Sequence, residues 1–374
     1  MGPLKGLRVV EMAGLGPCPL AGQMLADLGA EVAVIERASG PARPFDVNNR
    51  GKRAVALDLK NPAGREACLR LIDRADILIE GFRPGVMEKL GLGPADCHAR
   101  NPGLVYGRMT GWGQDGPMAM TAGHDLNYLA LTGMLGMMGE EGRPPVPPLN
   151  LVADYGGGTM LLLFGVMAAL WERQSSGLGQ VVDAAMIDGV SAFSGLFRMF
   201  AAQGRWRDGR ARNLLDGAAP FYRCYACADG KFLSVGPLEP QFFAILVAKA
   251  GLPDAHRSDQ NDPATWADRS AQYAALFATR PRDAWMEIFD GTDACVAPVL
   301  SPAEAEAHPH NRARAAHIDV GGMTQSAPAP RFARTPAGAP HPARAAGADT
   351  EAALADAGLD AEAIAAARAA GALG

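Results

Sequence analysis

Short apolar segments alternate with helical segments through the first 113 residues, and this order limits the folds that the chain can adopt. The apolar segments span residues 7–10, 31–37, 54–59, 76–82 and 104–113. Two of the intervening segments, LAGQMLADLGA and PAGREACLRLIDRA, carry apolar side chains at helical spacing. Because parallel strands need a crossover connection, usually a helix, this order predicts a parallel sheet. We therefore expect an α/β fold in which a large Rossmann-like domain contains an open parallel sheet.

The turn after the first apolar segment is rich in glycine, yet it does not form a dinucleotide-binding fingerprint. Gly14 and Gly16 have the required spacing, but Pro19 occupies the position of the third glycine. We therefore expect no nicotinamide cofactor. The net charge of -5 is spread along the chain without a basic block, so nucleic acid is not an expected partner either.

Three basic residues follow predicted strands, at the edge where open α/β sheets bind their ligands. Arg37, Lys60 and Arg83 each stand at the carboxyl end of such a strand. Taken singly, each is more simply a solvated surface charge. Together they are placed where the phosphates of a ligand could be bound.

A second unit is predicted from about Pro220, where FYRCYAC and KFLSVG form two strands around an Asp-Gly turn. The apolar stretch 160–171 is too short to span a bilayer, so we expect a buried helix there and no membrane partner. The predicted division is a large α/β domain over 1–185, a linker helix over 186–219, a small α+β domain over 220–307, and over 308–374 a linker with an Ala-rich helix at 351–370 that returns to the large domain.

The cysteines and the N-terminal residues favour a reducing, cytoplasmic location. The six cysteines do not have the spacing of a small disulfide-linked scaffold. Cys224 and Cys227 form a C-x-x-C pair, but without a second pair we interpret them as structural strand residues and expect no metal site. The chain starts without a positively charged leader and apolar core, so a secretory signal is not expected.

Three strings in order resemble one family. They are GRMTGWGQDGPMAMTAGHDLNYLALTG, LVADYGGG and SVGPLEPQFF, and LKGLRVVEMAGLGPCPLAGQMLADLGAEV and NRGKRAVALDLK precede them. Together they are similar to the α-methylacyl-CoA racemases, which belong to the family III CoA-transferases. The resemblance covers about residues 4–336, and only the Ala-rich tail departs from it. It implies a CoA-binding large domain, a smaller α+β domain and an interlocked homodimer.

The resemblance also implies a role for particular residues. The catalytic histidine falls on His124, the neighbouring aspartate on Asp125 and the second catalytic group on Asp154. Glu239 would orient the histidine from the partner subunit. The implied CoA-binding residues are Arg37, Leu57, Asp58, Leu59, Lys60, Gly81, Phe82, Arg83, Lys89, Gly123, Leu126, Asn127 and Tyr128. Lys89 stands where many relatives carry arginine, so it keeps the charge but not the planar fork that binds phosphate bidentately.

The chemistry of inversion explains why such residues are needed. Inverting a carbon that bears a hydrogen requires a base on one face and an acid on the other, because a single group that returned its proton would restore the starting isomer. Histidine titrates near working pH, and partial burial can raise an aspartate towards the same range. The enolate oxygen needs a donor, for which the resemblance implies the backbone N–H at the start of the helix after His124. CoA would be part of the substrate, so no separate cofactor is expected.

Other interpretations remain open for the same residues. Taken alone, Asp125 and Asp154 could simply cap helices, and Glu239 before a proline could be a turn residue. A family III CoA-transferase would instead use Asp154 as a nucleophile that forms an acyl anhydride. A CoA-binding protein without activity is a further alternative, and a nicotinamide oxidoreductase is the least favoured one.

Overall fold

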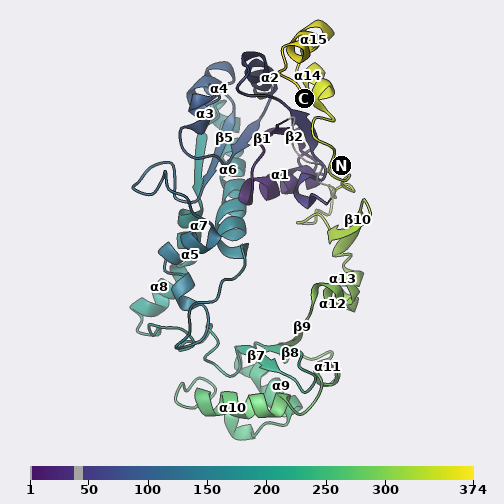
Figure 1. Ribbon diagram of the computed structural model, residues 1–374. Helices are drawn as coiled ribbons and strands as arrows, with labels where there is room; N and C mark the ends of the chain where they lie inside the picture. Colours follow the sequence, from purple (N-terminus) through teal and green to yellow (C-terminus); the bar gives the residue numbers. More distant parts are fainter. Residues whose placement is uncertain (1, 38–44) are drawn as a thin grey trace. The chain divides into compact units, whose positions relative to one another are not determined.

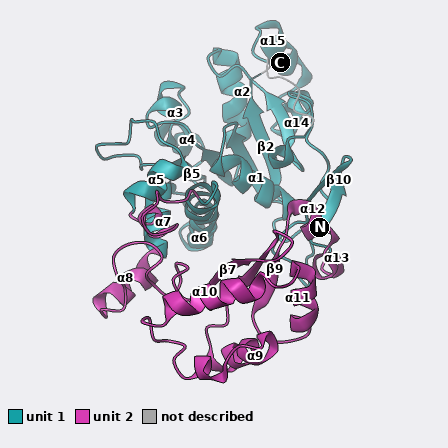
Figure 2. Cartoon of the chain, turned by 60° about the horizontal axis from the view of Figure 1, so that its bottom comes forward, with its two compact units in different colours: residues 1–132, 148–193, 315–374 teal, residues 133–147, 194–314 magenta. Residues whose placement is uncertain are grey.

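The computed structural model describes residues 2–37 and 45–374, which divide into two compact units (Figure 2). Unit 1 comprises residues 1–132, 148–193 and 315–374, and unit 2 comprises residues 133–147 and 194–314. Residues 133–147 therefore lie with unit 2, although they are within the range 1–185 expected for the large domain. The last sixty residues, 315–374, lie with unit 1.

Unit 1 contains a six-stranded sheet in the order β3-β2-β1-β4-β5-β6, and its strands all run parallel. The strands are β1 (Arg8–Met12), β2 (Glu31–Glu36), β3 (Arg53–Ala56), β4 (Ile77–Glu80), β5 (Val105–Thr110) and β6 (Val181–Ala185). The chain builds outwards from β1 in one direction and from β4 in the other, so the strand order reverses between β1 and β4. The predicted Rossmann-like open parallel sheet is confirmed, and its ligand-binding edge is expected at this reversal.

Helices cover both faces of the sheet, which explains why its strands are mostly apolar (Figure 1). The helices of unit 1 are α1 (Pro17–Asp27), α2 (Pro62–Ile72), α3 (Val86–Lys89), α4 (Pro94–Arg100), α5 (Asp125–Leu131), α6 (Leu161–Ser176), α7 (Met186–Phe193), α14 (Thr350–Asp356) and α15 (Ala361–Ala369), with a 3-10 turn η1 (Val47–Asn49). One core cluster joins residues of α2, α4, α14 and α15 to β1, β3 and β4. On β5, Gly107 packs against Leu162 and Val166 of α6.

The helix expected to be buried over 160–171 is longer and more exposed than predicted. A π-helix, η3 (Leu151–Met160), continues directly into α6, so that one helical segment of 26 residues runs from Leu151 to Ser176. By length and composition alone this segment could cross a membrane. One such helix is weak evidence of a membrane span, because core helices of soluble proteins meet the same criteria. Phe164 and Trp171 are each 73% exposed in the chain. The prediction of a buried helix was therefore wrong, because an apolar sequence does not specify what covers each of its faces.

Two other predicted helices are interrupted. The long helix expected after β6 ends at Phe193, and α8 (Gly195–Ala202) begins after Ser194, where unit 1 gives way to unit 2. The Ala-rich helix expected over 351–370 is divided into α14 and α15. Gly358 has a φ of +93° between them, and the Asp360 side chain accepts the N–H of Ala363 to start α15. Glycine conformation and a side-chain cap therefore override the helical propensity of alanine.

Unit 2 is the smaller α+β unit, as predicted. Its three-stranded antiparallel sheet has the order β7-β8-β9, and the predicted turn at Asp229 and Gly230 joins the first two strands. The remaining elements of unit 2 are β7 (Arg223–Ala226), β8 (Phe232–Val235), β9 (Val296–Val299), α9 (Pro240–Ala250), α10 (Trp266–Phe277), α11 (Arg282–Phe289), α12 (Pro302–Ala307), α13 (Pro309–Ala313), η2 (Leu135–Met137) and η4 (Asp254–Arg257). A hairpin of β10 (His317–Val320) and β11 (Met323–Ser326) belongs to unit 1.

We predict that Gly107→Ala lowers the free energy of unfolding by about 1–3 kcal/mol, the usual effect of overpacking a core. A β-carbon at this position would lie 2.9 Å from Leu162 Cδ1 and 3.1 Å from Val166 Cγ1. Denaturant unfolding of the full chain measures the change. Gly195→Ala is the matched control because a β-carbon there meets nothing within 4 Å. Equal stability of the two variants would contradict the close packing of α6 on β5.

Candidate active site

A cavity of about 370 Å³ lies at the carboxyl edge of the parallel sheet, where the strand order reverses. The residues that line it come from the turns after β1 and β4, the end of β5, the loop before α5, and the starts of η3 and α7. They are Leu15, Gly16, Pro17, Cys18, Gly81, Phe82, Arg83, Pro84, Met109, Thr110, Gly111, Trp112, Ala119, Thr121, Ala122, Gly123, His124, Tyr128, Asp154 and Met186. His124 and Asp154, which are thirty residues apart in the chain, therefore line the same cavity.

His124 is placed by the start of α5. Its backbone is extended, with φ -134° and ψ 173°, and it forms the N-cap of the helix. Its backbone N–H donates to Oδ1 of Asn127 at 3.1 Å, which fixes the turn. The imidazole is exposed and lines the cavity. The side chain of Asn127, one of the predicted CoA-binding residues, is thus engaged in capping this helix.

Asp125 is buried and joins two helix starts. Its Oδ2 accepts the backbone N–H of Ala153 at 2.8 Å and that of Asp154 at 2.7 Å. These N–H groups belong to the first turn of η3, where helices leave donors without an internal acceptor. Asp125 therefore caps a helix other than its own, and its side chain directly sets the backbone position of Asp154. The sequence indicated a cap at Asp125 but not which helix it would serve.

Asp154 occupies the first turn of the π-helix η3 and is half-buried. Burial raises the pKa of its carboxyl above the ordinary value, and the negative charge of Asp125 adds to this effect. A 3.4 Å hydrogen bond from Asn150 and the proximity of His124 act in the opposite direction. A carboxyl with a raised pKa is suited to both accepting and returning a proton.

The three glycines that follow Asp154 allow this helix to approach its neighbours closely. A β-carbon at Gly157 would lie 2.9 Å from the backbone nitrogen of Val190 in α7, and one at Gly158 would lie 3.1 Å from Cβ of Pro17 in α1. In the LVADYGGG string, the glycines are therefore needed for close helix packing, and Asp154 is the catalytic candidate. Wide π-helical turns are frequent at functional sites.

The ring of Tyr128 closes the cavity on the α5 side. Its hydroxyl donates to the backbone oxygen of Gly123, and its ring packs edge-on against Trp112, with the ring centroids 4.7 Å apart. A β-carbon at Gly111 would lie 2.0 Å from the Tyr128 ring, so only glycine fits there. Burial and then the charge of Asp154 raise the pKa of Tyr128, while Arg83 lowers it.

The predicted CoA-binding residues fall into two groups. Gly81, Phe82, Arg83, Gly123 and Tyr128 line the cavity. The others lie outside the cavity lining, and they are Arg37, Leu57, Asp58, Leu59, Lys60, Lys89, Leu126 and Asn127. Of these, Arg37 and residues 57–60 follow β2 and β3 at the same carboxyl edge, and Leu57 itself is buried in the core. Lys89 is exposed at the end of α3, and Leu126 is exposed on α5.

Glu239 belongs to unit 2, where it is exposed at the N-cap of α9 before Pro240. Its backbone oxygen accepts the N–H of Phe243 at 3.0 Å, so the helix holds the residue in place. The alternative in which Glu239 has only a local backbone role is consistent with this N-cap position. Within residues 2–37 and 45–374, the carboxylate of Glu239 makes no hydrogen bond or ion pair.

Sequence reasoning missed two buried ion pairs behind the same edge of the sheet. Lys52 Nζ lies 2.6 Å from Glu11 Oε2, and Arg108 Nε lies 3.0 Å from Glu80 Oε1. Burial raises the pKa of Glu11 to about 7 despite the opposing charge of Lys52. The other oxygen of Glu80 accepts the N–H of Phe82 at 2.7 Å and so shapes the turn that lines the cavity. Charged residues inside strands that are buried on both faces were the available signal.

Comparison with known proteins agrees with this architecture. Residues 4–350 match the model of CoA-transferase family III. The chain belongs to CoA-transferase family III. This family III chain is 47% identical over 335 residues to alpha-methylacyl-CoA racemase of Mus musculus, covering 89% of this chain and 87% of that protein. It is 43% identical over 337 residues to the Homo sapiens protein of the same name, with the same coverage.

A solved structure gives the same result for the fold. The crystal structure of a CaiB/BaiF family protein from Brucella suis aligns with a TM-score of 0.80 at 27% identity, covering 95% of this chain and 99% of that one. The resemblance identified from the sequence strings is therefore confirmed at the level of the family and of the fold.

We predict that Asp125→Ala in this family III chain lowers the free energy of unfolding by about 2–3 kcal/mol, because two buried N–H groups lose a charged acceptor. The substitution also releases the backbone of Asp154, so activity should fall as well. Denaturant unfolding and a rate assay on the same sample measure both effects. Asp188→Ala is the control, since Asp188 is exposed on α7. A fully stable and active Asp125→Ala variant would contradict the capping role.

Proposed function

We propose that the chain is an α-methylacyl-CoA racemase, an isomerase that interconverts (R)- and (S)-2-methyl-branched acyl-CoA thioesters by 1,1-proton transfer through an enolate. The observation that carries this proposal is that two proton carriers of different kinds, His124 and Asp154, line one cavity at the ligand-binding edge of the sheet. The names of two relatives that are 47% and 43% identical support the same substrate class.

Each of the two groups can take part in inversion. The exposed imidazole of His124 can exchange protons with solvent, and the raised pKa of Asp154 brings its carboxyl closer to working pH. One group removes the α-proton from one face, and the other delivers a proton to the opposite face. The roles are exchanged for the other enantiomer.

The enolate oxygen requires a hydrogen-bond donor while the proton is in transit. We assign this role to the backbone N–H of Asp125, the first residue of α5. At this position a helical N–H has no acceptor within its own helix. A fixed donor of this kind stabilises the developing charge without reorganisation during the reaction.

The CoA group is part of the thioester substrate, so we propose that no separate cofactor is needed. We propose that Arg83, in the cavity lining, and Arg37 and Lys60, further along the same edge, bind the phosphates of the nucleotide. The location is proposed to be cytoplasmic. All six cysteines are free thiols, which suits a reducing compartment.

We further propose that two copies of the chain form an interlocked homodimer in which Glu239 of the partner subunit orients His124. The apolar face of α6 supports an association between copies, because Phe164 and Trp171 are each 73% exposed in the single chain. Glu239 is itself exposed and held at the start of α9. A carboxylate that accepts from one imidazole nitrogen leaves the other nitrogen facing the substrate.

The main alternative is a CoA-transferase in which Asp154 attacks the thioester. A pure (R)-2-methylacyl-CoA incubated with the enzyme in deuterated water separates the two functions. Racemisation gives loss of optical purity together with deuterium at the α-carbon. Acyl exchange that depends on an added carboxylate would support transfer. Equal thioester binding by the wild type and His124→Ala, with neither exchanging the α-proton, would indicate a binding protein without activity.

We predict that His124→Ala and Asp154→Ala each reduce racemisation by at least about 10²- to 10⁴-fold, the usual contribution of a positioned proton-transfer group. Each variant should still exchange the α-proton of the one enantiomer that faces its remaining base, without inverting it. Chiral analysis and mass spectrometry in deuterated water detect the two events separately. Near-normal racemisation by either variant would overturn the assignment.

We predict that co-expression of His124→Ala with Glu239→Ala restores racemisation. In a mixed dimer, one site combines an intact His124 with an intact Glu239 from the other chain. Each variant alone should have low activity. The control is co-expression of His124→Ala with Asp154→Ala, two residues of the same unit, which leaves no complete site if both act from one chain. Recovery in the control alone, or a fully active monomer, would refute the assignment across subunits.

A further inference from the structure

The outer edge of the parallel sheet is covered by residues 349–374, which we call the edge-covering segment. Strand β3 is the last in the sheet order, so its outward-facing backbone groups have no strand neighbour within the described part of unit 1. Such an edge exposes a row of unsatisfied donors and acceptors. Here the edge-covering segment supplies their partners.

The hydrogen bonds follow the edge residue by residue. Ala54 N–H donates to Asp349 Oδ2 at 3.0 Å, and its oxygen accepts the N–H of Asp349 at 2.9 Å. Ala56 N–H donates to Thr350 Oγ1 at 2.9 Å, and its oxygen accepts the N–H of Gly374 at 3.2 Å. The segment thus acts as a substitute strand for β3.

The same pairing continues beyond the end of β3. Leu57 forms an antiparallel bridge with Leu373, and Asp58 N–H donates to the oxygen of Ala372 at 2.9 Å. The side chain of Asn61 donates to the oxygen of Ala370 at 2.7 Å. Leu57, Asp58 and Asn61 are therefore each held by residues 370–373.

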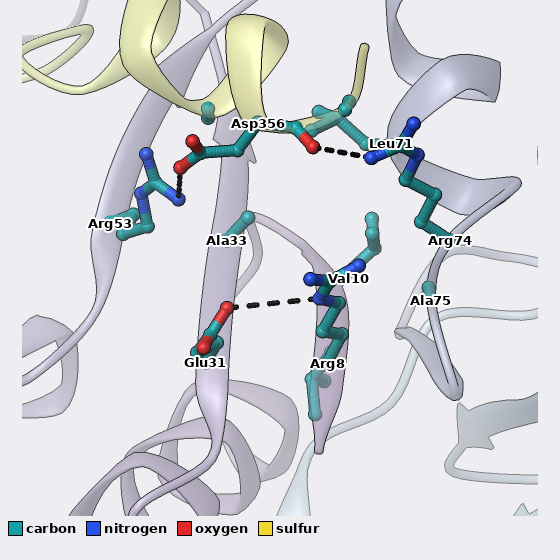
Figure 3. Close-up of a pocket in the computed structure, with 12 residues that line it drawn as sticks. Arg8, Val10, Glu31, Ala33, Arg53, Leu71, Arg74, Ala75 and Asp356 are labelled. Carbon is teal, nitrogen blue, oxygen red and sulfur yellow. Dashed lines mark hydrogen bonds and ion pairs between the residues drawn. The ribbon is translucent and has the colours of Figure 1, made fainter. Parts of the chain in front are cut away.

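Packing and charge anchor the segment at both ends. Leu354 and Leu373 are buried in the same core cluster as Leu57. At the amino end of the sheet, Asp356 accepts from Arg53 through its carboxylate at 2.7 Å and from Arg74 through its backbone oxygen at 2.8 Å (Figure 3). The segment is a fixed part of unit 1 and not a loose tail.

We infer that the edge-covering segment positions residues 57–60 for the nucleotide end of acyl-CoA. The inference rests on the proposed function, which assigns CoA binding to these residues. Asp58 and Lys60 keep exposed side chains. The backbone N–H of Asp58 is held by Ala372, and Lys60 N–H donates in turn to Asp58 Oδ1 at 3.0 Å. The family III model ends at residue 350, so the segment beyond Thr350, including residues 370–374, lies outside the family match.

The geometry separates binding of the nucleotide from the chemistry. Residues 57–60 do not line the cavity that contains His124 and Asp154. Loosening the segment should therefore weaken contacts to the nucleotide and leave the reacting groups in place. CoA binding is expected to be affected, and binding of pantetheine, which lacks the nucleotide, is not.

Two substitutions in the full chain test the inference. Thr350→Val removes the acceptor of Ala56 N–H with little change in volume, and Leu373→Ala shortens the side chain opposite Leu57. The control is Arg368→Gln, because Arg368 pairs with Glu351 inside the segment. Calorimetric titration gives the Kd for CoA and for pantetheine, and circular dichroism verifies folding.

We expect both variants to raise the Kd for CoA about three- to tenfold, the effect of losing about one contact, with the Kd for pantetheine unchanged. In the racemisation assay the KM for acyl-CoA should rise by the same factor at constant kcat. Arg368→Gln should match the wild type. An unchanged Kd for CoA, or equal changes for CoA and pantetheine, would overturn the inference. Absence of racemisation in the wild type would instead refute the proposed function and leave the Kd comparison valid.

Discussion

The Asp125 carboxylate accepts the backbone N–H groups of Ala153 and Asp154, at 2.8 and 2.7 Å, and so joins the start of α5 to the start of η3. His124 directly precedes the first of these helices, and Asp154 lies in the first turn of the second. One buried, charge-assisted contact therefore sets the spacing of the two candidate proton carriers.

The parallel sheet determines where this contact can be used. Its carboxyl edge brings the turns after β1, β4 and β5 to one cavity, and buried ion pairs stand behind that edge. Burying charges is costly, so these pairs contribute little net stability. Their value lies in fixing the turns, as Glu80 does when it accepts the N–H of Phe82. The edge-covering segment has a similar role at β3.

The sequence predicted the sheet, the two-unit composition and the family, because each depends on a local pattern or an ordered set of motifs. The sequence-based prediction failed where the burial or the length of a helix depends on the segments around it. The apolar residues of α6 look like a buried helix, yet Phe164 and Trp171 are exposed in the single chain. The Ala-rich end looks like one helix, yet Gly358 turns the chain back so that Leu373 reaches Leu57.

The sequence selects His124, Asp125 and Asp154 as candidate site residues, because the order of its motifs resembles that of a known family and motif order is a property of the chain itself. The partners of these residues do not follow from the sequence. The acceptance of two N–H groups by Asp125, the raised pKa of Asp154 and the pairing of β3 with residues 349–374 were decided only by the tertiary structure. Hydrogen bonding and desolvation depend on which distant segments come into contact, and local sequence patterns do not specify those contacts.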